Sequence, residues 1–212
     1  MNGLISQDEL SVIRERLQAD FNLPPEERKK RIDDRIDEIL DILLMEYIYG
    51  NEDANEMLGI FVNWSERTTM DTETITLGTE PYRIDTDRMN GAVNAVVADK
   101  TWKERVRDWY ESGNGTPDDI IRIIETESHR VYNDSILDVG EQAEEDTGGV
   151  SKTWFTMADE KVRSEHQYLE GMTVGIDDYF YTYDGHGAKY PGGFGVPELD
   201  INCRCSIWLT RQ

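Results

Sequence analysis

The last quarter of the chain, residues 152–205, limits the possible folds most strongly, because short apolar segments alternate there with turns and a glycine-rich stretch. The expected elements are a strand at 154–156, a helix at 158–169, strands or sheet edges at 172–176 and 179–183, and a final strand at 204–209. Residues 184–197 contain too much glycine for regular structure, so we expect a loop that its neighbours hold in place. This stretch therefore predicts a small mixed domain of strands and one helix.

A series of aromatic, charged and thiol residues runs through the same stretch in a fixed order. Its members are Trp154, Asp159, Arg163, His166, Tyr190, Pro191, Asn202, Cys203, Arg204 and Cys205. In this order and spacing, the series resembles the C-terminal domain of the phage Mu protein F-like, or minor head protein, family of tailed-phage head morphogenesis proteins. The resemblance extends back to about Ile120 through the segment IETESHRVYND, whereas the first 80 residues stay unassigned.

The resemblance implies a minor capsid protein that is located in the virion, in the head interior or at the portal vertex, after synthesis in the host cytoplasm. It would act in procapsid assembly, genome packaging or ejection. Its partners would be the portal protein and, as a further option, the major capsid or scaffold protein. The alternative is a metal-dependent enzyme or toxin-like effector built on the same C-terminal module. Because the sequence ends three residues after the expected final strand, we expect no appended toxin domain.

The residues themselves support no catalytic assignment. Asp159, Arg163 and His166 are spaced by four and three, so on a helix they would share one face, where a carboxylate can orient a histidine for acid–base chemistry. The sequence has no glycine-flanked nucleophile, phosphate-binding loop or HExxH motif to accompany them. We therefore expect no catalytic residue.

A metal site is the second chemical option. Cys203 and Cys205 would project to one side of the final strand, and His166 would complete three zinc ligands, with His186 or Asp159 as the fourth. The alternative is that both thiols pack under the helix while His166 donates to a backbone carbonyl or to Asp159. We expect no cofactor, and zinc stays the open alternative.

The charge of the chain disfavours binding to nucleic acid. It has 22 basic and 44 acidic side chains, a formal net charge of -22, and such a field repels phosphate. The densest basic cluster, residues 28–31, is followed at once by five acids within residues 33–41. We expect weak or no binding to duplex DNA. No apolar run is long enough to cross a bilayer, so we also expect no membrane association.

The chain before this last quarter reads as helical. Capping boxes at Ser6, Thr101 and Thr116 predict helix starts, and the expected helices cover 6–21, 25–49, 85–98, 101–112 and 117–143, with a break at Gly50–Asn51 and a strand or arm at 72–77. We divide the chain into a helical region at 1–80, a helical domain at 81–147 and the C-terminal domain at 148–212. The predicted class is α+β, with mainly helical N-terminal two-thirds and a small mixed C-terminal domain.

An apolar stripe marks the second of these helices. It consists of Ile32, Ile36, Ile39, Leu40, Leu43 and Tyr47, at steps of three and four. The stripe either packs within the chain or docks a partner subunit. In the last quarter, the exposed members of the aromatic run at 179–183 would be further interface candidates.

Overall fold

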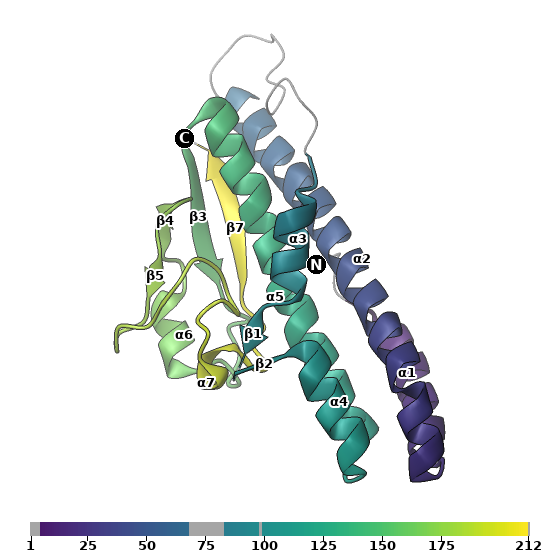
Figure 1. Cartoon of the computed structure of the whole chain (residues 1–212). Coiled ribbons are helices and arrows are strands. Elements are labelled where there is room, and N and C mark those ends of the chain that lie inside the picture. Colours follow the sequence, from purple (N-terminus) through teal and green to yellow (C-terminus); the bar gives the residue numbers. More distant parts are fainter. Residues whose placement is uncertain (1–4, 68–82, 98, 212) are drawn as a thin grey trace.

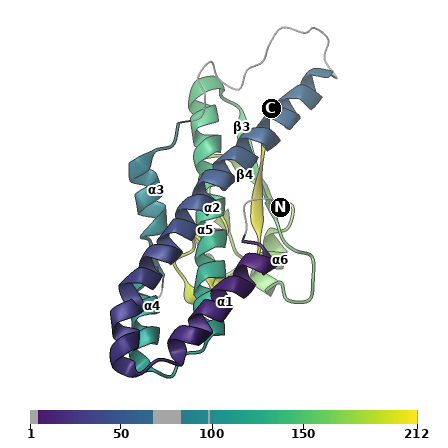
Figure 2. The same cartoon turned by 90° about the vertical axis from the view of Figure 1, so that its right-hand side faces the viewer.

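The computed structural model describes residues 5–67, 83–97 and 99–211. Two long helices, α2 (Pro25–Arg67) and α5 (Pro117–Thr147), pack along each other, and an antiparallel sheet packs on α5 (Figures 1 and 2). The expected α+β class is confirmed, with helices first and a small region of short strands at the end. None of the described helices combines the length and the apolar character that a bilayer span requires.

The remaining elements are short. The helices are α1 (Gln7–Phe21), α3 (Thr86–Val93), α4 (Trp102–Ser112), α6 (Ser164–Leu169) and α7 (Pro197–Asp200). The strands are β1 (Val96–Val97), β2 (Lys100–Thr101), β3 (Val150–Phe155), β4 (Thr173–Gly175), β5 (Phe180–Tyr181), β6 (Gly187–Ala188) and β7 (Ser206–Arg211). In the main sheet β3 lies between β4 and β7, and Trp154 of β3 is opposite Ile207 of β7.

The three predicted helix starts are confirmed. In each, a carboxylate three residues along accepts a hydrogen bond from the backbone N–H of the cap residue, and the pairs are Ser6 with Glu9, Thr101 with Glu104, and Thr116 with Asp119. These bonds satisfy N–H groups that a helix terminus leaves free. They depend on residues three apart, which is why sequence spacing was sufficient to locate them.

The apolar stripe of α2 belongs to the interior of the protein. Ile32, Ile36, Ile39, Leu43 and Tyr47 are buried, and the half-buried Leu40 packs against the same cluster. The cluster also contains apolar residues of α1, α3, α4 and α5. The docking interpretation of the stripe is therefore wrong, because these side chains already pack within the chain.

The predicted break at Gly50–Asn51 is also wrong, since α2 continues through it. A Cβ atom at Gly50 would lie 2.0 Å from Ser135 Oγ and 3.2 Å from the Tyr132 ring, both on α5. Glycine is therefore required there for the close approach of two helices, and packing outweighs its low helix propensity of about 1 kcal/mol.

Two other predicted boundaries differ from the structure. Helix α3 ends at Val93, where Asn94 caps it, and Val96–Val97 forms β1 instead of a last helical turn. Helix α5 continues to Thr147, four residues beyond the expected end and into the segment expected to be a linker. The segment expected to be a strand at 72–77 lies outside the described residues. The division into three regions stays a prediction.

Helix α5 supplies both hydrophobic clusters of the protein. Its first half, including Ile120 and Ile124, packs with the other helices, and its second half, including Ile136 and Leu137, packs with Trp154 and the sheet. The hydrophobic cores of the helical part and of the sheet are therefore both built on α5.

One charged residue is buried in the sheet. Lys152 of β3 has no exposed surface, its Nζ donates to the carbonyl of Ile176 at 2.5 Å, and it lies 5.7 Å from the centre of the Phe180 ring. Burial lowers the pKa of Lys152 from 10.5 to about 8. Keeping the buried ammonium charged therefore costs folding free energy, and a rise in pH that removes its proton relieves this cost.

We predict that Leu43→Ala lowers the free energy of unfolding by about 2–5 kcal/mol, because it leaves a cavity in the helical cluster. Urea denaturation followed by circular dichroism measures the change. The matched control is Met45→Ala on the same helix, where the side chain is 47% exposed and a change within about 0.5 kcal/mol is expected. Equal denaturation midpoints for the two variants would place Leu43 outside the core.

We predict that the free energy of unfolding of the wild type rises between pH 8 and pH 10.5, and that Lys152→Met abolishes this rise. In this window the unfolded chain holds the lysine proton and the folded chain does not, so the free energy of unfolding of the wild type increases with pH. The contribution of this lysine is about 1–3 kcal/mol. Urea titrations at several pH values measure it, with the exposed Lys30→Met as control. A variant with the wild-type pH profile would contradict the assignment.

Candidate functional site

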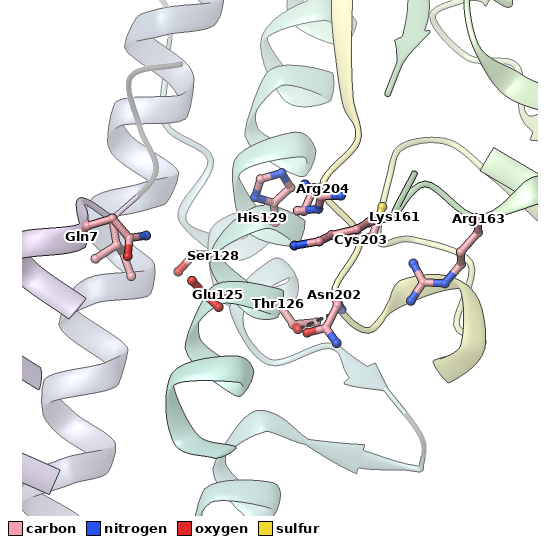
Figure 3. A pocket seen from close by; sticks show the side chains of 11 residues that line it. Gln7, Glu125, Thr126, Ser128, His129, Lys161, Arg163, Asn202, Cys203 and Arg204 are labelled. Atoms are coloured by element: carbon pink, nitrogen blue, oxygen red, sulfur yellow. Dashed lines mark hydrogen bonds between the residues drawn. The ribbon is translucent and has the colours of Figure 1, made fainter. Parts of the chain in front are cut away.

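A pocket of about 620 Å³ opens where the start of the chain, α5 and the C-terminal motif meet. Figure 3 shows Gln7 facing it from α1, opposite Lys161 and Arg204. The lining residues are Ile5, Gln7, Glu125, Thr126, Ser128, His129, Lys161, Arg163, Asn202, Cys203 and Arg204. Several members of the motif series thus lie along one wall of a cavity.

The lining of this pocket is locally basic in a strongly acidic chain. Lys161, Arg163 and Arg204 contribute three positive charges, whereas Glu125 is the single acid among the lining residues. Burial lowers the pKa of His129, so its imidazole is neutral at pH 7. The pocket can therefore hold a carboxylate or another small anion better than the rest of the acidic surface.

Arg204 is held at the pocket wall by Asp159. Its guanidinium donates two hydrogen bonds to the Asp159 carboxylate, at 2.9 and 2.7 Å, and these bonds hold the pKa of Asp159 below its usual value. Arg163 instead donates to the backbone carbonyl of Ile201. Both arginines therefore fasten the loops around the motif.

The expected helix at 158–169 is shorter than predicted, and this changes how Asp159, Arg163 and His166 lie. Ala158 has a left-handed backbone and Asp159 accepts from the N–H of Lys161, so the chain turns before α6 begins at Ser164. The three residues do not share a helix face, and the acid–base arrangement derived from their spacing is wrong. The bond to Arg204, distant in sequence, sets the position of Asp159.

The segment that carries the two cysteines is fixed by α5. Asn133 donates to the carbonyl of Cys205 at 3.1 Å and accepts from the N–H of Ile207 at 3.1 Å. Asn202 has a left-handed backbone, and its N–H donates to Thr126 Oγ1 at 3.2 Å. A single helix face thus sets the path of the chain through the motif and into β7.

The turn at Tyr190–Gly193 packs against the same helix, α5. The N–H of Gly193 donates to the carbonyl of Tyr190 at 3.1 Å. Gly192 has a φ of +86°, and a Cβ there would lie 3.1 Å from the side chain of Arg130. The turn therefore needs glycine both for its backbone and for its contact with α5. Pro191 in the same turn is buried.

His166 and the two cysteines form a buried cluster next to the pocket. His166 Nδ1 lies 3.6 Å from Cys203 Sγ and 3.5 Å from Cys205 Sγ, and the three side chains are between 1% and 5% exposed. The His166 ring stacks on Phe194 and meets the edge of Trp154. The structure thus brings together residues that are 37 and 39 positions apart in sequence.

The other two proposed ligands lie elsewhere. His186 is paired with Asp184, and Asp159 is bonded to Arg204. Among the described residues, the group able to hold a metal is His166, Cys203 and Cys205. A hydrogen bond between the thiols lowers the pKa of Cys203, helped by His166, while the same bond raises the pKa of Cys205.

Sequence reasoning missed two buried carboxylates that support the site. Glu127 is bonded to Arg130 at 3.0 and 2.8 Å and also to Arg105, with no exposed surface. Asp200 accepts the N–H groups of Phe194 and Val196 at 3.0 and 3.1 Å. The available signal for Glu127 was a charged residue within the apolar face of α5. Asp200 had no comparable signal.

Comparison of the sequence with known proteins places the chain in a family. Residues 89–208 match the family model described as "Phage Mu protein F like protein". Over 117 residues, the chain is 32% identical to an NAD(+)--arginine ADP-ribosyltransferase EFV of Enterococcus faecalis (strain ATCC 700802 / V583), covering 55% of this chain and 24% of that protein.

The Minor head protein GP7 of Bacillus phage SPP1 is 32% identical over 82 residues, covering 39% of this chain and 26% of that protein. The chain thus spans about a quarter of the length of both relatives. No solved structure gives a significant match. Because the family model covers more than half of the sequence, from within α3 into β7, the chain belongs to the phage Mu protein F like family.

Proposed function

We propose that this protein is a minor head protein of a tailed phage, located at the portal vertex of the virion and acting in head morphogenesis. The match of residues 89–208 to a phage head family carries the proposal, and the similarity to the Minor head protein GP7 supports it. Its role would lie in procapsid assembly, genome packaging or ejection, through contact with the portal protein.

The bonds that the motif side chains make to other parts of the fold support a structural role over an enzymatic one. Asp159 is bonded to Arg204, Arg163 to a backbone carbonyl, and Asn133 to the strand that follows the cysteines. Such groups stabilise the fold, whereas catalytic groups must reach a substrate. The similarity to an ADP-ribosyltransferase covers a quarter of that longer protein, and its activity is not assigned to this chain.

The best candidate surface for the portal is the exposed tyrosines near β5. Tyr168, Tyr179, Tyr181 and Tyr183 are 49–60% exposed, and they contact one another in pairs. Tyrosine is enriched in protein interfaces because it buries a large rigid ring and keeps a polar group. The stripe of α2 is buried, so this aromatic surface replaces it as the proposed contact.

We predict that the protein co-purifies with the portal protein of its own phage when both are expressed together. The triple variant Tyr179→Ser, Tyr181→Ser, Tyr183→Ser should raise the Kd of the complex at least tenfold, as measured by biolayer interferometry. A tenfold rise corresponds to a loss of about 1.4 kcal/mol of binding free energy. Tyr49→Ser, on α2 and 46% exposed, is the matched control and should bind as the wild type does.

Two results would contradict this assignment at different levels. If the folded wild type does not bind portal protein, the portal role is wrong. If the wild type binds and the triple variant binds equally well, the portal contact lies on another surface. Circular dichroism of each variant separates loss of binding from loss of fold.

Direct contact with DNA is not part of the proposed role. Most arginines of the described chain are paired with carboxylates, for example Arg35, Arg88 and Arg130. The basic pocket lining contributes three charges, and one of them, Arg204, is already bonded to Asp159. Appreciable unspecific affinity draws on roughly six to ten phosphate contacts.

We predict that the isolated protein forms no complex with duplex DNA below about 1 µM at physiological salt, because few counterions are released. A gel-shift assay with a random-sequence duplex tests this, and a basic DNA-binding protein serves as the positive control. A submicromolar complex would show that basic residues gather on one surface, and a DNA-handling role would have to be added.

A further inference from the structure

The cluster of His166, Cys203 and Cys205 has the dimensions of a metal site. With zinc–sulfur bonds of about 2.3 Å and zinc–nitrogen bonds of about 2.0–2.1 Å, a tetrahedral angle gives a nitrogen–sulfur separation of about 3.5 Å. The two separations in the protein are 3.6 and 3.5 Å. Both nitrogen–sulfur edges of the cluster therefore match those of a zinc tetrahedron.

Hydrogen bonding alone explains this arrangement less well. An unprotonated imidazole nitrogen has one in-plane lone pair and accepts one good hydrogen bond. Here two sulfur atoms lie at nearly the same distance from His166 Nδ1. A cation placed on that lone pair would contact both sulfurs at once, whereas only one of the two thiols can donate a good hydrogen bond to it.

The surroundings leave room for a fourth ligand. A small cavity of about 10 Å³ borders His166 and Cys205, and its lining includes Met157 and Val162. This is about the space that one water molecule needs. Among the described residues, neither His186 nor Asp159 joins the group of potential ligands around His166, so a water in this cavity is the fourth ligand that fits the structure.

We propose that His166, Cys203 and Cys205 bind one Zn²⁺ ion. Two thiolates and an imidazole form a soft, tetrahedral donor set that suits zinc. On binding, each thiol loses its proton to solvent, and the metal takes the place of the bonds within the cluster. The ion would join α6 to the segment before β7 and so fix the pocket wall formed by Cys203 and Arg204. This inference does not depend on the proposed portal role.

The test is metal analysis of the full chain, expressed with added zinc and purified without chelator. Inductively coupled plasma mass spectrometry should find one zinc per chain in the wild type and less than a tenth of that in Cys203→Ser and Cys205→Ser. The matched control is His186→Gln, an exposed histidine outside the cluster, which should keep its zinc. Folded wild type without zinc, or cysteine variants that retain it, would overturn the proposal.

A second measurement avoids variants, since a serine in this core can unfold the domain. Wild-type protein is freed of metal with a chelator under denaturing conditions, refolded, and titrated with Co²⁺. We expect a cobalt–thiolate charge-transfer band that saturates at one equivalent, and none after both thiols are alkylated. A refolded chain with native circular dichroism and no such band would exclude the site.

Discussion

The burial of α5 on almost every side is the constraint on which the rest of the structure depends. From Thr126 to Gly140 its residues are buried, apart from the half-buried His129, because the helices pack on one face and the sheet on another. A buried polar group without a partner costs about 1–3 kcal/mol, so bonds to other segments stabilise the charged and amide side chains of this helix. Glu127 therefore binds two arginines, Asn133 binds the start of β7, and Asp134 binds Arg88. These bonds hold distant segments in register around α5, whose residues 125, 126, 128 and 129 also line the pocket.

The sequence was informative where the controlling contacts are local or periodic. Capping boxes use residues three apart, and the stripe of α2 follows the helical repeat, so both were located correctly. It misled where a distant contact overrides a local preference. Gly50 looked like a break, yet α2 continues through it, and the glycine gives room for Ser135 of α5. Asp159 lies in a turn before α6, where Arg204 binds it. Neither contact could be derived from spacing.

In the candidate site, too, some features were predicted from the sequence and others were not. The proximity of His166 to the two cysteines was anticipated from a helix and a terminal strand, although the cysteines precede β7 instead of lying within it. The pocket was not anticipated, because Gln7, Ser128, Lys161 and Asn202 come from four separate segments. A cavity formed in this way requires the whole tertiary arrangement, and no short stretch of sequence contains its signal.

The direction of the motif side chains bears on how much the family resemblance can say about function. The Trp154 ring is fully buried, Asp159 and Arg204 hold each other, and His166 faces the two thiols. Residues that pack and bond within the chain specify a fold, and a fold can serve different functions. It is therefore consistent that similar modules occur in relatives with two different names, each about four times the matched length. What this chain binds must then be decided by residues that reach the surface, and these are the exposed tyrosines near β5 and the basic side chains of the pocket lining, two of which belong to the motif.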